Sequence, residues 1–150
     1  MKSARSLVLA LAVVAAAPAA WAAFGLRQCY DNSYSYSPTY DYYYVRYYYK
    51  PTVSYANYDY HYCIYYPSSP QYVYYYNPTS QLYWGRYELG SKGDKRYSLL
   101  AEKDRKKDLK EISEKAFPEP AAMPAIPGSE DKVAIEPPPE NVPKDAKPTK

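Results

Sequence analysis

The chain has 150 residues and a formal net charge of +3, and 23 of its residues are tyrosine. Leucine, isoleucine, valine and phenylalanine make up only 17 of the 128 residues from Ala23 onward. That share is below the roughly 20% at which a conventional hydrophobic core is expected. The composition argues against an ordinary enzyme domain, and the near-neutral charge argues against a strongly basic nucleic-acid-binding protein.

Residues 1–22 contain the three parts of a secretory signal peptide. Basic Lys2 and Arg5 precede an uncharged apolar run, and small alanines precede the junction with Ala23. The apolar run, LVLALAVVAAA, is shorter than the roughly 20 residues that cross a membrane. We therefore predict cleavage between Ala22 and Ala23. The mature protein would be secreted, periplasmic or on the cell surface, without an integral membrane anchor.

The chain has two cysteines, Cys29 and Cys63. Export would place them in an oxidising compartment, so we expect one disulfide within the chain, with a bridge between two chains as the alternative. An internal bridge would contribute roughly 4 kcal/mol in the chain-entropy model. No metal or other cofactor is expected, because His61 is the sole histidine and no carboxylate cluster accompanies it.

Residues 23–71 form a tyrosine-rich, low-complexity segment. The sequence Tyr-Asp-Tyr at 40–42 recurs at 58–60, and aromatic runs end at prolines. Tyrosine favours extended structure, whereas proline cannot donate a hydrogen bond to a sheet. We therefore expect short extended runs that are separated by turns.

Residues 72–101 carry the clearest pattern of secondary structure. Two strand-like runs, YVYYY and QLYWGRYE, flank a turn at 77–80 in which proline presets φ at the second position. A third run, KRYSLLA, follows a glycine-containing loop. We predict a three-stranded antiparallel meander over about residues 72–100, and hence a small, mostly-β fold.

The remaining sequence is polar. Residues 102–116 are dense in both signs of charge, which indicates a charged linker or a short helix. Residues 117–150 hold nine of the fifteen prolines and few apolar side chains. We predict a Pro-rich, disordered C-terminal tail with polyproline II character, so that large parts of the chain would be disordered.

One stretch resembles a known group of proteins. YVYYYNPTSQLYWGRYE, followed by YSLL, DRKKDLKEI and AFPEPAAMPAIPG, is similar to small secreted tyrosine-rich bacterial proteins that are known as uncharacterised sequences. The resemblance covers about residues 72–128. It implies secretion and a shared C-terminal half, and it carries no activity.

The sequence offers little for catalysis. It lacks a nucleophile elbow and a glycine-rich phosphate loop, and His61 is the only imidazole that could act as a base. Asp59 lies two residues away, on the same face if this segment is extended. We interpret His61 as a polar position in a strand and expect no enzymatic activity.

Tyrosine combines a large apolar ring with a hydroxyl group, so it can hold surfaces at a low entropic cost. We therefore favour a secreted structural or surface-associating protein that self-associates in an envelope or matrix. The alternative is a small carbohydrate or cell-wall-polymer binding module. Its aromatic platform would consist of Tyr83, Trp84, Arg86 and Tyr87. No nucleic-acid partner is expected, despite interleaved aromatic and basic residues, because of the charge balance and export.

Overall fold

The computed structural model describes residues 27–144. Its strands are β1 (Gln28–Tyr30), β2 (Ser35–Ser37), β3 (Tyr42–Tyr49), β4 (Asp59–Tyr65), β5 (Tyr72–Asn77), β6 (Leu82–Glu88) and β7 (Tyr97–Leu99). Three single 3-10 turns follow, η1 (Glu102–Asp104), η2 (Leu109–Glu111) and η3 (Glu114–Ala116). The signal peptide and the cleavage site at Ala22 and Ala23 lie outside the described residues and stay predictions.

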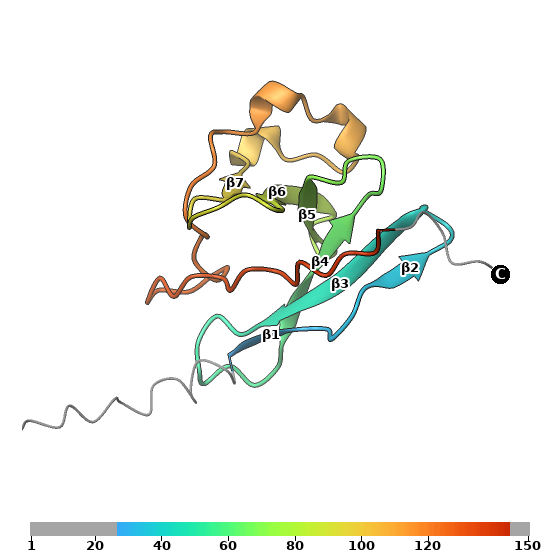
Figure 1. Ribbon diagram of the computed structural model, residues 1–150. Coiled ribbons are helices and arrows are strands. Elements are labelled where there is room, and N and C mark those ends of the chain that lie inside the picture. The colour runs from blue at the N-terminus through green and yellow to red at the C-terminus, as the bar shows by residue number, and fades with distance from the viewer. Residues whose placement is uncertain (1–26, 145–150) are drawn as a thin grey trace, which may run out of the picture.

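The strands form one antiparallel sheet in the order β1-β3-β4-β5-β6-β7, and β2 pairs with the other half of β3 (Figure 1). The fold is therefore mostly β, as predicted. The predicted meander is present as β5, β6 and β7, with the turn after Asn77 held by the Asn77 side chain. The prediction of only three strands is wrong, because the sheet continues through β4 and β3 to β1.

The tyrosine runs form strands because they bury alternate side chains. Along β3, Tyr43, Val45 and Tyr47 are buried, whereas Tyr44 is half-buried and Arg46 is exposed. This two-residue period is the one that separates the two faces of a strand. The aromatic rings replace the scarce aliphatic residues, since one buried tyrosine removes about 150–250 Å² from water.

One face of the sheet is covered by the C-terminal segment 118–144, which we call the strap. Ile126 and Ile135 of the strap belong to the same buried cluster as Tyr47 and Tyr75 of the sheet. The strap crosses from the β7 edge, where Ala121 pairs with Tyr97, towards β1 (Figure 1). Residues 118–144 thus follow a defined path, which corrects the prediction of disorder for this part of the tail.

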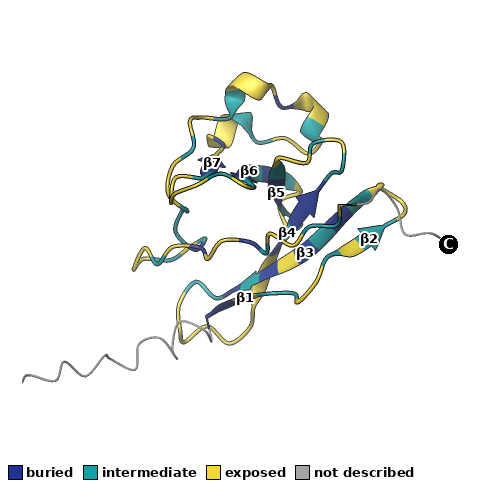
Figure 2. Ribbon diagram, in the orientation of Figure 1, coloured by how far each residue is buried: buried dark blue, intermediate teal, exposed yellow. Residues whose placement is uncertain are grey.

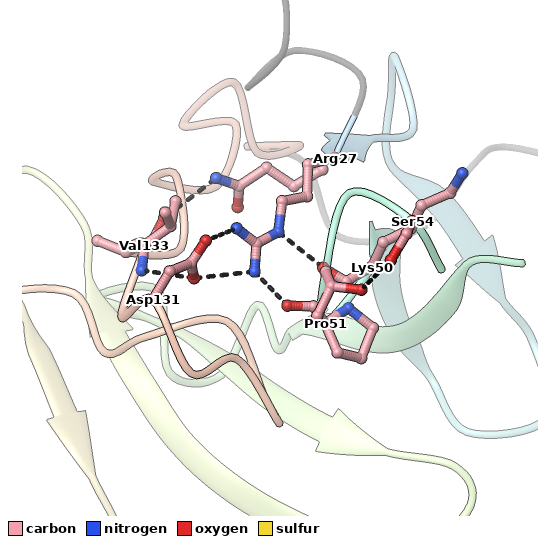
Figure 3. Close-up of polar contacts among 9 residues, drawn as sticks. Arg27, Lys50, Pro51, Ser54, Asp131 and Val133 are labelled. Atoms are coloured by element: carbon pink, nitrogen blue, oxygen red, sulfur yellow. Dashed lines mark hydrogen bonds and ion pairs between the residues drawn. The ribbon is translucent and has the colours of Figure 1, made fainter. Parts of the chain in front are cut away.

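Polar contacts hold the strap against β1. The buried guanidinium of Arg27 donates to the Asp131 carboxylate and to the backbone oxygens of Lys50 and Pro51 (Figure 3). Nearby, the Tyr30 hydroxyl donates to the backbone oxygen of Glu136 at 2.6 Å. Arg27 and Tyr30 thus supply donors to a carboxylate and a backbone oxygen of the strap, which is rich in proline and so offers few N–H donors of its own.

The opposite face is covered only at one end. Leu100 and Ile112, from the segment that contains the 3-10 turns, pack against Ile64, Tyr74 and Tyr83. The turns themselves are largely exposed, as Figure 2 shows. The rest of this face, over β3 and β4, keeps partly exposed tyrosines. We call it the groove face, and the other the strap face.

The expected internal disulfide is wrong for this fold. Both cysteines are free, with Cys29 exposed and Cys63 buried. Cys29 pairs with Tyr48 and Cys63 pairs with Val45, which places the cysteines two strands apart and on opposite faces of the sheet. Strand geometry separates their Cα atoms by about 14 Å, whereas a disulfide requires less than about 7 Å. A bridge between two chains through Cys29 stays a prediction.

Candidate functional site

A groove of about 820 Å³ lies on the groove face, between the uncovered tyrosines and the 3-10 turns. Its floor comes from β3, β4, β5 and β6, and one rim comes from the segment around η2. Its lining residues are Ser37, Tyr40, Tyr42, Tyr44, Tyr62, Ile64, Tyr66, Tyr76, Tyr83, Lys107, Asp108 and Lys110. We call this site the tyrosine groove.

The sheet register brings these rings together. Tyr44 pairs with Ile64 across β3 and β4, and the rings of Tyr44 and Tyr62 meet edge to face at 5.4 Å. Tyr42 contacts Tyr66 in the same way at 5.6 Å. Offset and edge-to-face pairs of this kind are the favourable geometries for aromatic rings. The groove is thus lined by rings that hold one another in place.

Tyr40 provides the most exposed ring of the groove. It lies in the turn between β2 and β3 and is 67% exposed. Its ring stacks on that of Tyr42, with centroids 5.5 Å apart and planes 7° apart. This turn resembles the one before β6, because both contain Pro-Thr and both place a residue at positive φ, Asp41 and Gln81. The fold of the turn therefore presents the Tyr40–Tyr42 pair at one end of the groove.

Three phenols of the groove have a raised pKa and are therefore protonated near neutral pH. Burial raises the pKa of Tyr42 to about 12, and it also raises the pKa of Tyr66 and Tyr83. The hydroxyls of Tyr66 and Tyr83 lie 2.8 Å apart and form a hydrogen bond. Neutral hydroxyls can both donate and accept, so they suit a ligand that carries hydroxyl groups of its own.

The rim adds charged groups of both signs. The Tyr83 backbone N–H donates to the Lys106 backbone oxygen at 2.9 Å, which holds this segment beside β6. The Asp108 carboxylate accepts from the backbone N–H of Lys110 and caps η2. Lys107 and Lys110 are exposed beside it. The groove thus combines an apolar floor with a few polar groups at its margin, as ligand sites commonly do.

The platform predicted from the sequence is divided between the two faces. Tyr83 lines the tyrosine groove, whereas Tyr87 is buried with the strap-face cluster. Arg86 is buried on the groove face between Tyr72 and Phe117. These side chains therefore do not form one exposed platform.

Trp84 lies at a bulge in β6, because Tyr75 pairs with Gly85 while Tyr76 pairs with Tyr83. Its ring contacts the His61 ring at 5.0 Å, and the Arg105 guanidinium lies 4.3 Å from its centroid. Trp84 packs against the strap-face cluster, so it is partly buried rather than presented to a ligand.

His61 is buried on β4, with its Nε2 3.3 Å from the Tyr49 hydroxyl. Burial, together with the nearby positive charge of Arg105, lowers the pKa of His61 to about 4. The imidazole is therefore neutral at physiological pH. Asp59 is exposed at the start of the same strand. The histidine occupies a packed position in a strand, in line with its interpretation from the sequence.

Most groove residues come from a region in which the sequence predicted only short extended runs. The pattern of DYHYCIY could have identified the groove residues of β4, because Tyr60, Tyr62 and Ile64 occupy every second position. In β3 that alternation is hidden, since tyrosine occupies both the buried and the half-buried positions.

The comparisons give no family for this chain. No family model matches it, and the searches of curated proteins and of solved structures found no match. Residues 27–144 contain no helix with the length and hydropathy that a membrane span requires. Within the described part of the chain, no three metal-ligating side chains gather in one place. The resemblance to small secreted tyrosine-rich bacterial proteins stays a prediction.

Proposed function

We propose that this is a non-catalytic, surface-associating protein that binds a polysaccharide of the cell envelope in the tyrosine groove. The observation that carries the proposal is the groove itself, about 820 Å³ in volume and lined mainly by tyrosine rings. Location outside the cytoplasm rests on the signal-peptide pattern of residues 1–22. The envelope would then be the surface that the mature protein meets.

A sugar ring matches the chemistry of the groove. It has an apolar face of C–H groups, which packs on an aromatic ring, and a rim of hydroxyls, which need hydrogen-bond partners. Tyr40, Tyr62 and Tyr76 offer partly exposed rings and hydroxyls at the groove. Lys107 and Lys110 add donors along the rim. An extended chain of sugars could use several of these contacts at once, so that individually weak contacts add up.

Self-association through strand edges is supported less well. Each edge of the sheet consists of strands of only three residues, and short edge strands pair poorly with other chains. On β7, the Tyr97 backbone already exchanges two hydrogen bonds with Ala121 of the strap. The tyrosine-rich strands β3, β4 and β5 lie in the interior of the sheet. Association through the groove face therefore fits the fold better than association through an edge.

Binding to isolated envelope polysaccharide tests this proposal. The mature protein should co-sediment with the polymer and bind soluble fragments of it saturably. Tyr40→Ala should weaken binding by about fivefold to tenfold, because an exposed ring is lost while the core stays intact. Tyr55→Ala is the matched control, since Tyr55 is also exposed but does not line the groove. Equal binding by the two variants would contradict a site in the groove.

The structural alternative gives a different outcome in the same samples. A self-associating matrix protein would form large species without polysaccharide, and sedimentation velocity would detect them. A polysaccharide-binding protein should stay monomeric until the polymer is added. Self-assembly without polymer binding would therefore contradict the proposal and support the structural alternative.

A further inference from the structure

The charged side chains of the tyrosine groove all lie on one rim. Lys107, Asp108 and Lys110 line the groove, and they belong to the segment around η2. Every other lining residue is a tyrosine, a serine or an isoleucine, so the floor and the opposite wall contain no acidic or basic residue. Two lysines face one aspartate on this rim, which leaves the groove with an excess of positive charge along a single side.

The backbone of this rim is held in place. At its start, the segment accepts a hydrogen bond from the backbone N–H of Tyr83 at 2.9 Å. Farther along, Leu109 and Ile112 pack against the buried cluster of the groove face. Lys107 and Lys110 lie between these attachments and are exposed. The two ammonium groups therefore extend from an anchored segment beside the tyrosine floor.

Neither lysine is neutralised by the chain itself. The ion pairs found among residues 27–144 all use arginine side chains, so Lys107 and Lys110 take part in none of them. The carboxylate of Asp108 accepts from the backbone N–H of Lys110 at 2.9 Å, and it is thus engaged in capping η2. Cationic groups that line one side of a groove attract an anionic ligand.

The phenols of the floor do not oppose an anion. The pKa of Tyr42 is raised to about 12 by burial, and burial also raises the pKa of Tyr66 and of Tyr83. These hydroxyls are therefore neutral near neutral pH and can donate hydrogen bonds to a carboxylate. The groove offers ring faces on its floor and positive charge on its rim.

Two kinds of anionic polymer share the charge that such a rim attracts. One consists of sugar acids, which carry carboxylates, and the other consists of open chains joined by phosphates. Each unit of a sugar-acid polymer has a ring whose C–H face packs on an aromatic side chain. An open-chain phosphate polymer has no such ring, so the tyrosine floor favours the sugar acids.

We propose that the tyrosine groove binds an acidic polysaccharide whose sugars carry carboxylates. The sugar rings lie on the tyrosines, and the carboxylates face Lys107 and Lys110. This inference rests on the proposed function and narrows its ligand from polysaccharides in general to anionic ones. Exposed charge pairs are individually weak, so the two lysines select among polymers while the rings supply most of the affinity.

Calorimetric titration of the mature protein with polygalacturonate and with its methyl ester tests the inference. The two polymers share one backbone, and esterification removes the charge. The acid should bind about fivefold to tenfold more tightly at low salt. Added salt should reduce this advantage, because exposed charges are screened. Inorganic polyphosphate, which has charge but no rings, should bind more weakly than polygalacturonate.

Paired lysine variants locate the selectivity. Lys107→Gln combined with Lys110→Gln should reduce the preference for the acid over the ester to less than about twofold and leave binding of the ester unchanged. Lys92→Gln combined with Lys95→Gln is the control, since it removes the same charge from exposed lysines that do not line the groove. Tyr40→Ala should weaken both polymers alike, because it removes a ring and no charge.

Four outcomes would overturn the inference. Equal binding of the acid and the ester would do so, and the proposed function would survive if Tyr40→Ala still weakened both. An equal loss of selectivity in the two double lysine variants would assign it to net charge instead of the rim. Tighter binding of polyphosphate than of polygalacturonate would mean that charge alone is recognised. The absence of saturable binding to polygalacturonate would exclude sugar acids as the ligand.

Discussion

On the strap face, Tyr47 and Tyr75 are fully buried in a cluster with Ile126 and Ile135 of the strap. On the groove face, Tyr42 of β3 and Tyr62 of β4 come from the same central part of the sheet, yet they stay partly exposed. Both faces consist mainly of tyrosine side chains. They differ in how much of each face another segment of the chain covers. Tyrosine thus forms a core where a segment covers it and a candidate ligand surface where none does.

The hydroxyl groups show the same contrast. The Tyr47 hydroxyl donates to the Gln28 side chain at 2.6 Å, and the hydroxyls of Tyr30 and Tyr75 lie 2.7 Å apart. A core of tyrosine needs such internal partners, because a buried hydroxyl without one is costly. On the groove face, rings that remain half-exposed can offer their hydroxyls to a ligand instead.

The largest expected effect is unfolding at alkaline pH. Burial raises the pKa of Tyr42 and of Tyr49 to about 12, from an ordinary value of 10. The unfolded chain therefore loses phenol protons first, and the free energy of unfolding falls as the pH rises from 10 towards 12. A fully buried group of this kind contributes at most about 3 kcal/mol and the partly exposed Tyr42 less, so several of them together approach the stability of a small domain.

Circular dichroism and phenolate absorbance, recorded against pH, check this expectation. Both should change together in one cooperative transition above pH 10. Tyr49→Phe should make the transition less steep, because one titrating group is removed while the ring remains. A gradual rise of phenolate absorbance with the sheet intact would contradict a tyrosine core.

The next effect tests the difference between the two faces directly. Tyr47→Ala should lower the free energy of unfolding by about 3–5 kcal/mol, because it leaves a cavity beneath the strap. Tyr62→Ala should cost about 1 kcal/mol, since that ring is only partly covered. Chemical denaturation measures both values. Equal losses of unfolding free energy in the two variants would mean that the strap does not bury its face more than the groove face is buried.

A smaller effect is expected from His61 in acid. Burial lowers the pKa of His61 to about 4, whereas the unfolded value is 6.5. The unfolded chain therefore binds the proton first, and about 3 kcal/mol of stability is lost as the pH falls from 6.5 to 4. His61→Gln should flatten this part of the stability curve, whatever its effect at neutral pH. An unchanged slope in the variant would assign the acid sensitivity to other groups.

The strap itself can be loosened at its attachment to Arg27. Asp131→Asn removes the ion pair but leaves the backbone contacts of Arg27, so we expect a small loss of stability that is concentrated in the strap. Amide exchange of Ile126 and Ile135, whose N–H groups bond within the strap, should become faster. Asp94→Asn, in the exposed loop before β7, is the control. Unchanged exchange in the strap would contradict its attachment through Asp131.

These contrasts explain what could be predicted from the sequence. Residues 72–100 were predicted correctly as a meander, because proline and glycine punctuate strands that alternate in polarity. For β1 to β4 the sequence predicted only short extended runs and not their pairing into one sheet, since the count of aliphatic residues gave no weight to tyrosine as core. The strap was missed because its prolines suggested disorder. Its order depends on distant donors, such as the Tyr34 hydroxyl, which bonds to the Pro139 oxygen at 2.8 Å.

The candidate site shows the same limit. Tyr83 was identified from the sequence, but its partners Tyr42, Tyr62 and Tyr66 come from a segment that lacked a recognisable pattern. Local sequence cannot say which face of β3 a distant segment will cover. The covering segments decide which tyrosines remain available, and they begin only at Leu100, far along the chain from β3.

The smallest expected effect concerns the cysteines, which again lie on opposite faces. Cys29→Ser should change the free energy of unfolding by less than about 0.5 kcal/mol, because the side chain is exposed and not bridged to Cys63. Burial, with Asp31 and Glu136 nearby, raises the pKa of the Cys29 thiol, so its alkylation should be slow at neutral pH and faster at higher pH. Cys63 should react only after unfolding, because it is fully buried. Mass spectrometry should therefore find one alkylated cysteine in the native chain and two in denaturant. A chain with no free thiol in denaturant would contradict the sheet register, which holds the two sulfurs too far apart to bond.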